Sequence, residues 1–321
     1  MLGRMLRWAA LSVAVLTVGC TANVEGEQDS PGNSSSLPMP TADNAAEPFE
    51  LDLLAEASSG YDAKNAYELM RLCDLSYQDE SAVAGELAQR GIDPVAGHYR
   101  AFSNSSTHTF AYYVEAKGAA FVVFRGTDPK SWQNIAENGD AAAAPEVVGY
   151  AHAGFALALD GVWSDLAAYV RSRDPLPLYV TGHSLGAALA TIATARMLLD
   201  PNGVTIPVAA LYSIASPRAG DAAFANGLAE VMAGAGTYFA RIVNECDPVT
   251  NMPVRAGPPL FVPFFEHVSY GTDENDFVEW IEGAHEMATS IPFTACPPAG
   301  LDVDIGEHMP AAYVSQLAAQ L

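Results

Sequence analysis

Ser184 stands between Gly182 and Gly186, in the sequence GHSLG. This G-x-S-x-G spacing is typical of a serine nucleophile on a sharp turn between a strand and a helix. The apolar run 177–181 and the alanine-rich stretch 187–199 supply that strand and that helix. Larger side chains in place of the two glycines would collide across such a turn. Ser184 is therefore the predicted nucleophile, against the alternative of a glycine-rich turn with an incidental serine.

A serine hydroxyl becomes nucleophilic when an imidazole takes its proton and a carboxylate orients that imidazole. On a strand–turn–helix serine, the acid and then the histidine are expected downstream, on loops that follow strands. Asp247 follows the apolar run 238–243 and precedes Pro248, so it is the first choice for the acid. Asp221 opens an expected helix, where capping is its default role. The remaining rivals lack a preceding strand; they are Asp273, Asp276, Asp302 and Asp304.

The helices and strands that must position these residues are expected to alternate along the chain. Helical patterns are expected over 66–87, 154–170 and 185–199, and strands over 99–102, 109–114, 119–124, 178–181, 208–214 and 238–243. The turn at 115–118 predicts an early antiparallel hairpin. Strands that alternate with helices predict an α/β fold, with a largely parallel central sheet covered on both faces.

The N-terminus reads as an export signal. Arg4 and Arg7 precede the uncharged apolar run 9–19, which is too short to span a bilayer. Small residues and then Cys20 follow, which resembles the processing site of a bacterial lipoprotein. Lipidation of Cys20 is the favoured prediction, and ordinary signal cleavage nearby is the alternative. The expected location is the cell envelope, with membrane contact through this anchor, or otherwise the secreted fraction.

Composition sets the domain plan and excludes one class of partner. A signal peptide (1–19), a flexible linker (20–48) rich in Ser, Pro and Gly, and one folded domain (49–321) are predicted. The net charge of −23, with no cluster of basic residues, argues against nucleic acid as a partner. The sequence leaves the oligomeric state open.

If Cys20 is acylated, three cysteines remain. They are Cys73, Cys246 and Cys296, which allows one disulfide. Cys246 and Cys296 both flank candidate catalytic loops, so this pair is weakly favoured.

Five ordered motifs give the chain a family resemblance from about residue 66 to 321. They are VTGHSLGAAL at 180–189, FRGT at 124–127, HAGF at 152–155, SPRAG at 216–220 and RIVNECDPV at 241–249. Together they resemble the class 3 lipases, the fungal-lipase-like family of the α/β-hydrolase superfamily. The resemblance implies a serine ester hydrolase without metal or cofactor, acting on a lipid or small ester.

The resemblance assigns the acid role to Asp247 and the base role to His308. In the family an H-x-x-Y pattern carries the histidine; here Tyr313 lies further away, with Pro310 between them. His267 and then His285 are the fallbacks for the base. Two other histidines are expected to be structural; they are His152 and His183.

The oxyanion hole and a lid follow from the same resemblance. Two backbone N–H groups are expected to bind the oxyanion, those of Leu185 and Thr127, with the Thr127 hydroxyl as a third donor. Residues 128–138 would form a short lid with Trp132 and Ile135 on its apolar face, and a plain loop is nearly as good an interpretation. Residues 271–300 match nothing in the family.

The predicted activity is that of a triacylglycerol lipase or carboxylesterase. Two alternatives are open. One is a phospholipase or aryl-ester esterase on the same scaffold, because the nucleophile motif is identical in all of them. The other is a lipid-binding surface lipoprotein that has lost catalysis, which the altered spacing after His308 would favour.

Overall fold

The computed structural model describes 61–92, 97–127, 143–200, 203–244, 247–252, 265–266, 277–281, 284–287 and 306–321. All of these residues belong to the unit Ala42–Leu321. Several predictions lie outside them, namely the signal peptide (1–19), Cys20, the linker (20–48), the lid residues Trp132 and Ile135, His267, and the pairing of Cys246 with Cys296.

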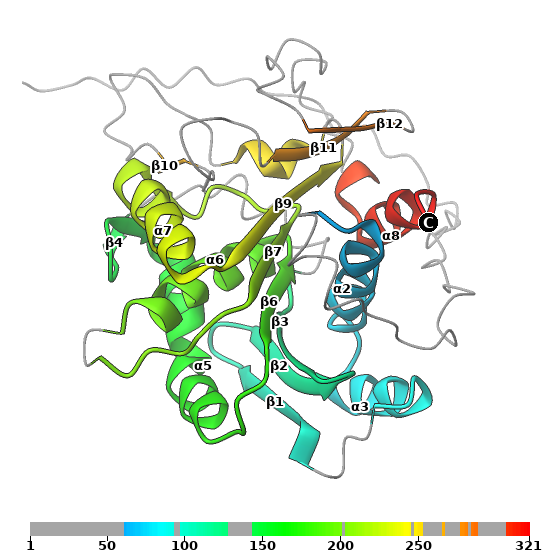
Figure 1. Ribbon diagram of the computed structural model, residues 1–321, viewed down its shortest axis with the longest axis horizontal. Helices are drawn as coiled ribbons and strands as arrows, with labels where there is room; N and C mark the ends of the chain where they lie inside the picture. The colour runs from blue at the N-terminus through cyan, green and yellow to red at the C-terminus, as the bar shows by residue number, and fades with distance from the viewer. Residues whose placement is uncertain are drawn as a thin grey trace, which may run out of the picture. The chain divides into compact units, whose positions relative to one another are not determined.

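A central sheet of eight described strands runs in the order β1-β2-β3-β6-β7-β9-β11-β12 (Figure 1). Its strands are β1 (Tyr99–Asn104), β2 (Thr109–Ala116), β3 (Ala119–Phe124), β6 (Leu178–His183), β7 (Ala210–Ile214), β9 (Tyr238–Asn244), β11 (Phe277–Ile281) and β12 (Ala284–Met287). The pairs β3–β6, β6–β7, β7–β9 and β9–β11 are parallel. The pairs β1–β2, β2–β3 and β11–β12 are antiparallel. The predicted, mostly parallel α/β sheet with an early antiparallel hairpin is therefore confirmed.

Helices cover both faces of this sheet (Figure 1). They are α2 (Ala63–Leu75), α3 (Glu80–Gln89), α5 (Ala153–Arg171), α6 (Leu185–Leu198), α7 (Ala222–Ala235) and α8 (Pro310–Ala318), with short 3₁₀ turns η2 (Pro248–Asn251) and η3 (Gly306–His308). α5, α6 and α7 pack on one face, and α2 and α8 pack on the other. Among the described residues, none of the helices combines the length and the hydrophobicity of a membrane-spanning segment.

The central strands are apolar because both of their faces are buried. Every residue of β3 is buried, and its side chains alternate between the two hydrophobic cores: Val122 and Phe124 face α5 and α6, whereas Phe121 and Val123 face α2. Two-sided burial of this kind is the usual environment of parallel strands. It explains why β3, β6 and β7 read as continuous hydrophobic runs.

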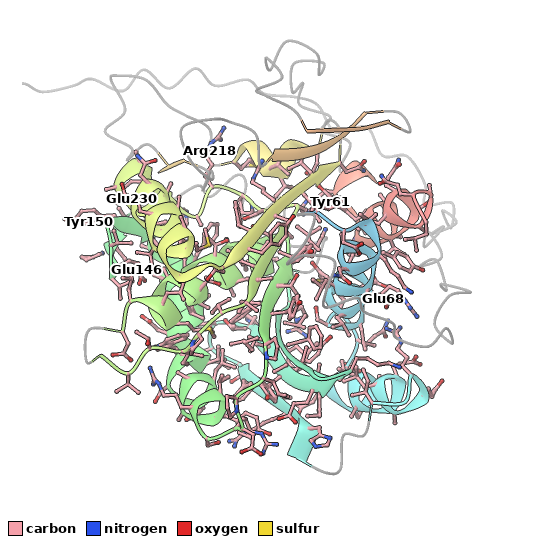
Figure 2. The ribbon with its side chains drawn as sticks, viewed as in Figure 1. Tyr61, Glu68, Glu146, Tyr150, Arg218 and Glu230 are labelled. Atoms are coloured by element: carbon pink, nitrogen blue, oxygen red, sulfur yellow. The ribbon has the colours of Figure 1, made fainter. Side chains whose placement is uncertain are left out.

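The α2 face also contains an ion pair. Glu68 and Arg71 lie one turn apart on α2, where Figure 2 labels Glu68. Arg71 Nη1 is 3.0 Å from Glu68 Oε2, and both side chains are 4% exposed. Each charge is therefore neutralised by a partner within the same helix.

A second, small antiparallel sheet was not predicted. It contains β4 (Ala143–Pro145), β5 (Tyr150–His152), β8 (Gly220–Asp221) and β10 (Phe265–Glu266), in the order β10-β8-β5-β4. These strands have two or three residues each, too few to show the alternation on which a strand prediction depends.

Candidate active site

Ser184 occupies the sharp turn between β6 and α6. Its backbone angles are φ 62° and ψ −130°, a conformation that side-chain-bearing residues rarely adopt and that costs about 1–3 kcal/mol. Two backbone hydrogen bonds hold the turn: the Ser184 N–H donates to Ile214 O at 3.0 Å, and Ala187 N–H donates to Ser184 O at 2.9 Å. The strained residue is thus fixed from the neighbouring strand and from the first turn of α6.

The glycines around Ser184 have backbone atoms where a side chain would begin. A Cβ on Gly182 would lie 2.2 Å from Gly186 O, and a Cβ on Gly186 would lie 2.1 Å from Phe124 O. A Cβ on Gly126 would lie 2.7 Å from His183 O and 3.0 Å from Ser184 Cβ. The collision inferred from the sequence is therefore found at Gly182 and Gly186, and the segment after β3 adds a third close approach through Gly126.

Asp247, His308 and Ser184 form a hydrogen-bonded series at the carboxyl edge of the sheet. His308 Nε2 lies 2.8 Å from Ser184 Oγ. On the other side of the ring, His308 Nδ1 lies 2.8 Å from Asp247 Oδ2 and 3.0 Å from Oδ1. All three residues are at most 2% exposed. The structure thus brings together the predicted nucleophile, base and acid, which come from three different loops.

The Asp247 carboxylate accepts hydrogen bonds from three sides. Besides the imidazole, the Val249 N–H donates to Oδ1 at 2.9 Å and the Tyr313 hydroxyl donates to Oδ2 at 2.7 Å. The Asp247 backbone carbonyl accepts from Thr250 Oγ1 at 2.8 Å. These bonds satisfy a fully buried charge, which would otherwise be strongly unfavourable.

Tyr313 itself is held in one orientation. Its oxygen accepts a hydrogen bond from the Asn244 N–H at 2.9 Å, at the end of β9. Burial, and then the charge of Asp247, raise the pKa of Tyr313 well above its ordinary value. The phenol therefore keeps its proton and acts as a donor to the carboxylate.

His183 packs beside His308. Its ring centroid lies 5.0 Å from that of His308 and 5.4 Å from that of Tyr313. Its Nδ1 lies 2.8 Å from the hydroxyl of Tyr77, which the sequence interpretation missed. Burial, and then the charge of His308, hold the pKa of His183 well below its ordinary value.

The candidate oxyanion donors lie where β3 and β6 end side by side. Phe124 pairs in parallel with Gly182, so the segment Arg125–Gly126–Thr127 leaves the sheet next to Ser184. The Thr127 hydroxyl oxygen is buried and has no hydrogen-bond partner among the described residues. Leu185 is the first residue of α6, where backbone N–H groups lack an acceptor within the helix.

The other candidate residues that the structure describes have structural contacts of their own. The Asp221 carboxylate accepts from the Phe224 N–H at 2.8 Å and caps α7, and the His152 ring stacks on Phe155 at 4.2 Å. Cys73 is a buried free thiol. His285 lies in β12, and its side chain is outside the described part, as are Asp273, Asp276, Asp302 and Asp304. The described residues contain no cluster of His, Cys, Asp and Glu that could hold a metal ion.

Comparison with known proteins identifies related sequences. Residues 121–256 match the model of the family described as Lipase (class 3). The chain is 39% identical over 98 residues to a secreted mono- and diacylglycerol lipase A of Penicillium cyclopium, which covers 30% of this chain and 29% of the relative. It is 32% identical over 149 residues to a lipase of Rhizomucor miehei, covering 44% of this chain and 39% of the relative. The chain thus spans well under half the length of these two relatives.

Solved lipase structures also resemble this chain. A mono- and diacylglycerol lipase from Aspergillus oryzae superimposes with a TM-score of 0.49 at 22% identity, covering 65% of this chain and 78% of that chain. The Rhizomucor miehei triacylglyceride lipase gives a TM-score of 0.48 at 23% identity, covering 66% and 77%. The family match spans β3, the serine turn, β7, β9 and Asp247, in the order expected from the sequence. Residues 121–256 of this chain are thus similar to the class 3 lipase family.

Proposed function

We propose that this protein is a serine ester hydrolase that forms an acyl-enzyme on Ser184. The observation that carries the proposal is the hydrogen-bonded series from Asp247 through His308 to Ser184, with 2.8 Å at each of its two closest contacts. These distances fall within the range for proton transfer between a nucleophile and its base.

In the first half of the reaction, Ser184 Oγ attacks the ester carbonyl carbon while its proton passes to His308 Nε2. The carbonyl oxygen becomes an oxyanion, which accepts hydrogen bonds from the backbone N–H groups of Leu185 and Thr127 and from the Thr127 hydroxyl. The alcohol then leaves with the proton from His308, and the acyl group stays on Ser184.

In the second half, a water molecule gives its proton to His308 Nε2 and attacks the acyl carbon. The oxyanion forms again at the same donors, Ser184 regains its proton from His308, and the carboxylic acid is released. Asp247 stays ionised throughout and offsets the positive charge that His308 gains. The proposed steps require no metal and no cofactor.

The proposed substrates are glyceride esters, in line with the names of the relatives. One is called a mono- and diacylglycerol lipase and another simply a lipase. A further relative, 33% identical over 96 residues, is the Arabidopsis thaliana "Phospholipase A(1) DAD1, chloroplastic", so phospholipid esters are the natural comparison substrates.

The proposal includes export and a lipid anchor, which rest on the sequence. The basic and apolar N-terminus followed by Cys20 supports a signal peptide and lipidation. The Penicillium relative is named a secreted lipase, which supports export. Mass spectrometry of the mature protein should find an acylated Cys20 at its N-terminus; an unmodified N-terminus elsewhere would leave export without the anchor.

The test of function is hydrolysis of p-nitrophenyl esters of graded chain length by the wild type and by Ser184→Ala. We expect hydrolysis by the wild type alone, and equal rates from the two proteins would overturn the proposal. A preference for long chains would mark a lipase, and a preference for short chains a carboxylesterase. A rise in rate when the substrate passes from monomers to aggregates would support a lid at Trp132 and Ile135, and a constant rate would oppose it.

A further inference from the structure

The hydroxyl of Tyr77 lies between two parts of the site that are far apart in the sequence. On one side, it is 2.8 Å from Nδ1 of His183, the residue before the nucleophile. On the other side, it lies against the backbone of Gly126, the residue before Thr127. The contact is close: a Cβ on Gly126 would lie 2.2 Å from the Tyr77 oxygen. One phenol therefore links the end of β3 to the turn that carries Ser184.

The chemistry of the phenol and the imidazole fixes the direction of their hydrogen bond. The Gly126 backbone lowers the pKa of the Tyr77 phenol, as an N–H that faces the phenol oxygen does. Burial outweighs this effect and keeps the pKa of Tyr77 well above its ordinary value, so the hydroxyl keeps its proton. The hydroxyl donates a hydrogen bond to His183 Nδ1, which acts as the acceptor. The ring proton of the neutral His183 is therefore on Nε2.

The segment held by Tyr77 is the one that presents Thr127. Gly126 is pressed against the serine turn, since a Cβ there would lie 2.7 Å from His183 O and 3.0 Å from Ser184 Cβ. Contact of Tyr77 with Gly126 restricts the φ and ψ rotations of Gly126, and these rotations set the direction of the following planar peptide unit, which carries the Thr127 N–H. An oxyanion donor must be preorganised to stabilise the transition state.

We propose that Tyr77 is a positioning residue of the oxyanion hole, which holds the Gly126–Thr127 peptide in place by bridging it to His183. This inference rests on the proposed esterase function. Oxyanion stabilisation is stronger in the transition state than in the bound substrate. Loss of the bridge therefore lowers kcat and leaves KM nearly unchanged.

The bridge also keeps His183 uncharged next to the base. The Tyr77 hydroxyl occupies the Nδ1 lone pair that a second proton would need. His308 becomes positively charged when it takes the serine proton, and its ring centroid is 5.0 Å from that of His183. A neutral His183 does not oppose that charge.

The test compares Tyr77→Phe with Tyr112→Phe in the full chain. Tyr112 serves as the control because it is fully buried and does not touch the site. Its hydroxyl donates a hydrogen bond to Leu72 O of α2 at 2.7 Å, so the change to Phe also removes one buried hydrogen bond. We expect kcat to fall by about 10- to 100-fold in Tyr77→Phe, with KM within about twofold of the wild type. Tyr112→Phe should keep both constants, and thermal unfolding of both variants reports their folding.

A second measurement needs no variant. Nitrogen-15 spectra of the wild-type histidines should show His183 as the neutral Nε2–H tautomer, with an Nδ1 shift typical of a hydrogen-bond acceptor. A protonated Nδ1 would overturn the bridge, as would equal kcat values for Tyr77→Phe and Tyr112→Phe. A wild type that neither hydrolyses esters nor reacts at Ser184 with a fluorophosphonate would instead overturn the proposed function, and the spectra would still decide the Tyr77 contact.

Discussion

The phenol of Tyr313 donates a hydrogen bond to Oδ2 of Asp247 at 2.7 Å, the same oxygen that lies 2.8 Å from His308 Nδ1. His308 ends η3, and α8 begins at Pro310, so Tyr313 lies in the first turns of a new helix. The wider spacing between histidine and tyrosine thus reflects a break between two helical turns. It places both side chains on one carboxylate, which argues against the non-catalytic alternative.

Tyr313→Phe should weaken both the site and the fold. The change removes the hydroxyl that accepts from the buried Asn244 N–H, and the loss of this buried hydrogen bond costs about 1–3 kcal/mol of unfolding free energy. Asp247 loses one of its restraints, and we expect kcat to fall about tenfold, equivalent to about 1.4 kcal/mol. Urea unfolding and ester hydrolysis measure the two effects. Tyr169→Phe, which removes a hydroxyl bonded to Gly97 O away from the site, should leave kcat intact.

Thr127→Val tests the side-chain donor of the oxyanion hole. The variant keeps the backbone N–H and the branched shape but lacks the buried hydroxyl. We expect kcat to fall about 10²-fold with little change in KM, because the hydroxyl acts on charge that develops in the transition state. Thr237→Val, which removes a buried hydroxyl bonded to Val208 O, serves as the control. A loss that appears in KM alone would assign Thr127 to substrate binding instead.

Gly186→Ala should destabilise the protein severely, because its Cβ would lie 2.1 Å from the backbone oxygen of Phe124. Neither backbone can move without shifting β3 or α6, so a loss of about 3 kcal/mol is expected, at the upper end of the usual range for overpacked cores. Gly85→Ala in α3 meets nothing within 4 Å and should stabilise the protein by up to about 1 kcal/mol. Comparable unfolding midpoints for the two variants would contradict the packing described for the serine turn.

Stability should fall as the pH falls through the titration of the unfolded histidine. An unfolded histidine titrates at about 6.5, whereas the pKa of folded His183 is held well below this, chiefly by burial. Below about pH 6.5 the unfolded chain therefore binds a proton that the folded chain does not. The resulting slope is at most about 1.4 kcal/mol per pH unit.

His183→Asn removes this contribution while its side-chain oxygen can still accept from Tyr77. Urea unfolding of both proteins between about pH 5 and pH 7.5 should give a shallower pH dependence for the variant. Parallel curves would mean that His183 takes up a proton in the folded state, contrary to its buried surroundings.

The local parts of this fold could be read from the sequence. β6, Ser184 and α6 were predicted within two residues, because a buried strand, two required glycines and an alanine-rich helix all act over neighbouring positions. The turn between β2 and β3 was predicted for the same reason. Its Lys117 and Gly118 both have positive φ, of 52° and 83°, which suits a tight hairpin.

The contacts that complete the site could not be read in this way. Tyr77 and His183 are 106 residues apart, and Tyr313 and Asp247 are 66 apart. The family pattern after the histidine points to Tyr313 but not to its contact with Asp247, and no local pattern distinguishes Tyr77 from the tyrosines that only fill the core. Their role depends on how α2 and α8 pack on the same face of the sheet, a property of the whole fold.

The most direct test of the central claim is intact-mass and peptide mass spectrometry after treatment with a fluorophosphonate. The account predicts one adduct per molecule, on Ser184, formed by the wild type and absent from Ser184→Ala and, at the same reagent concentration, strongly slowed in His308→Ala. An adduct on another residue, or none on a folded wild type, would contradict the assignment of Ser184 as the nucleophile.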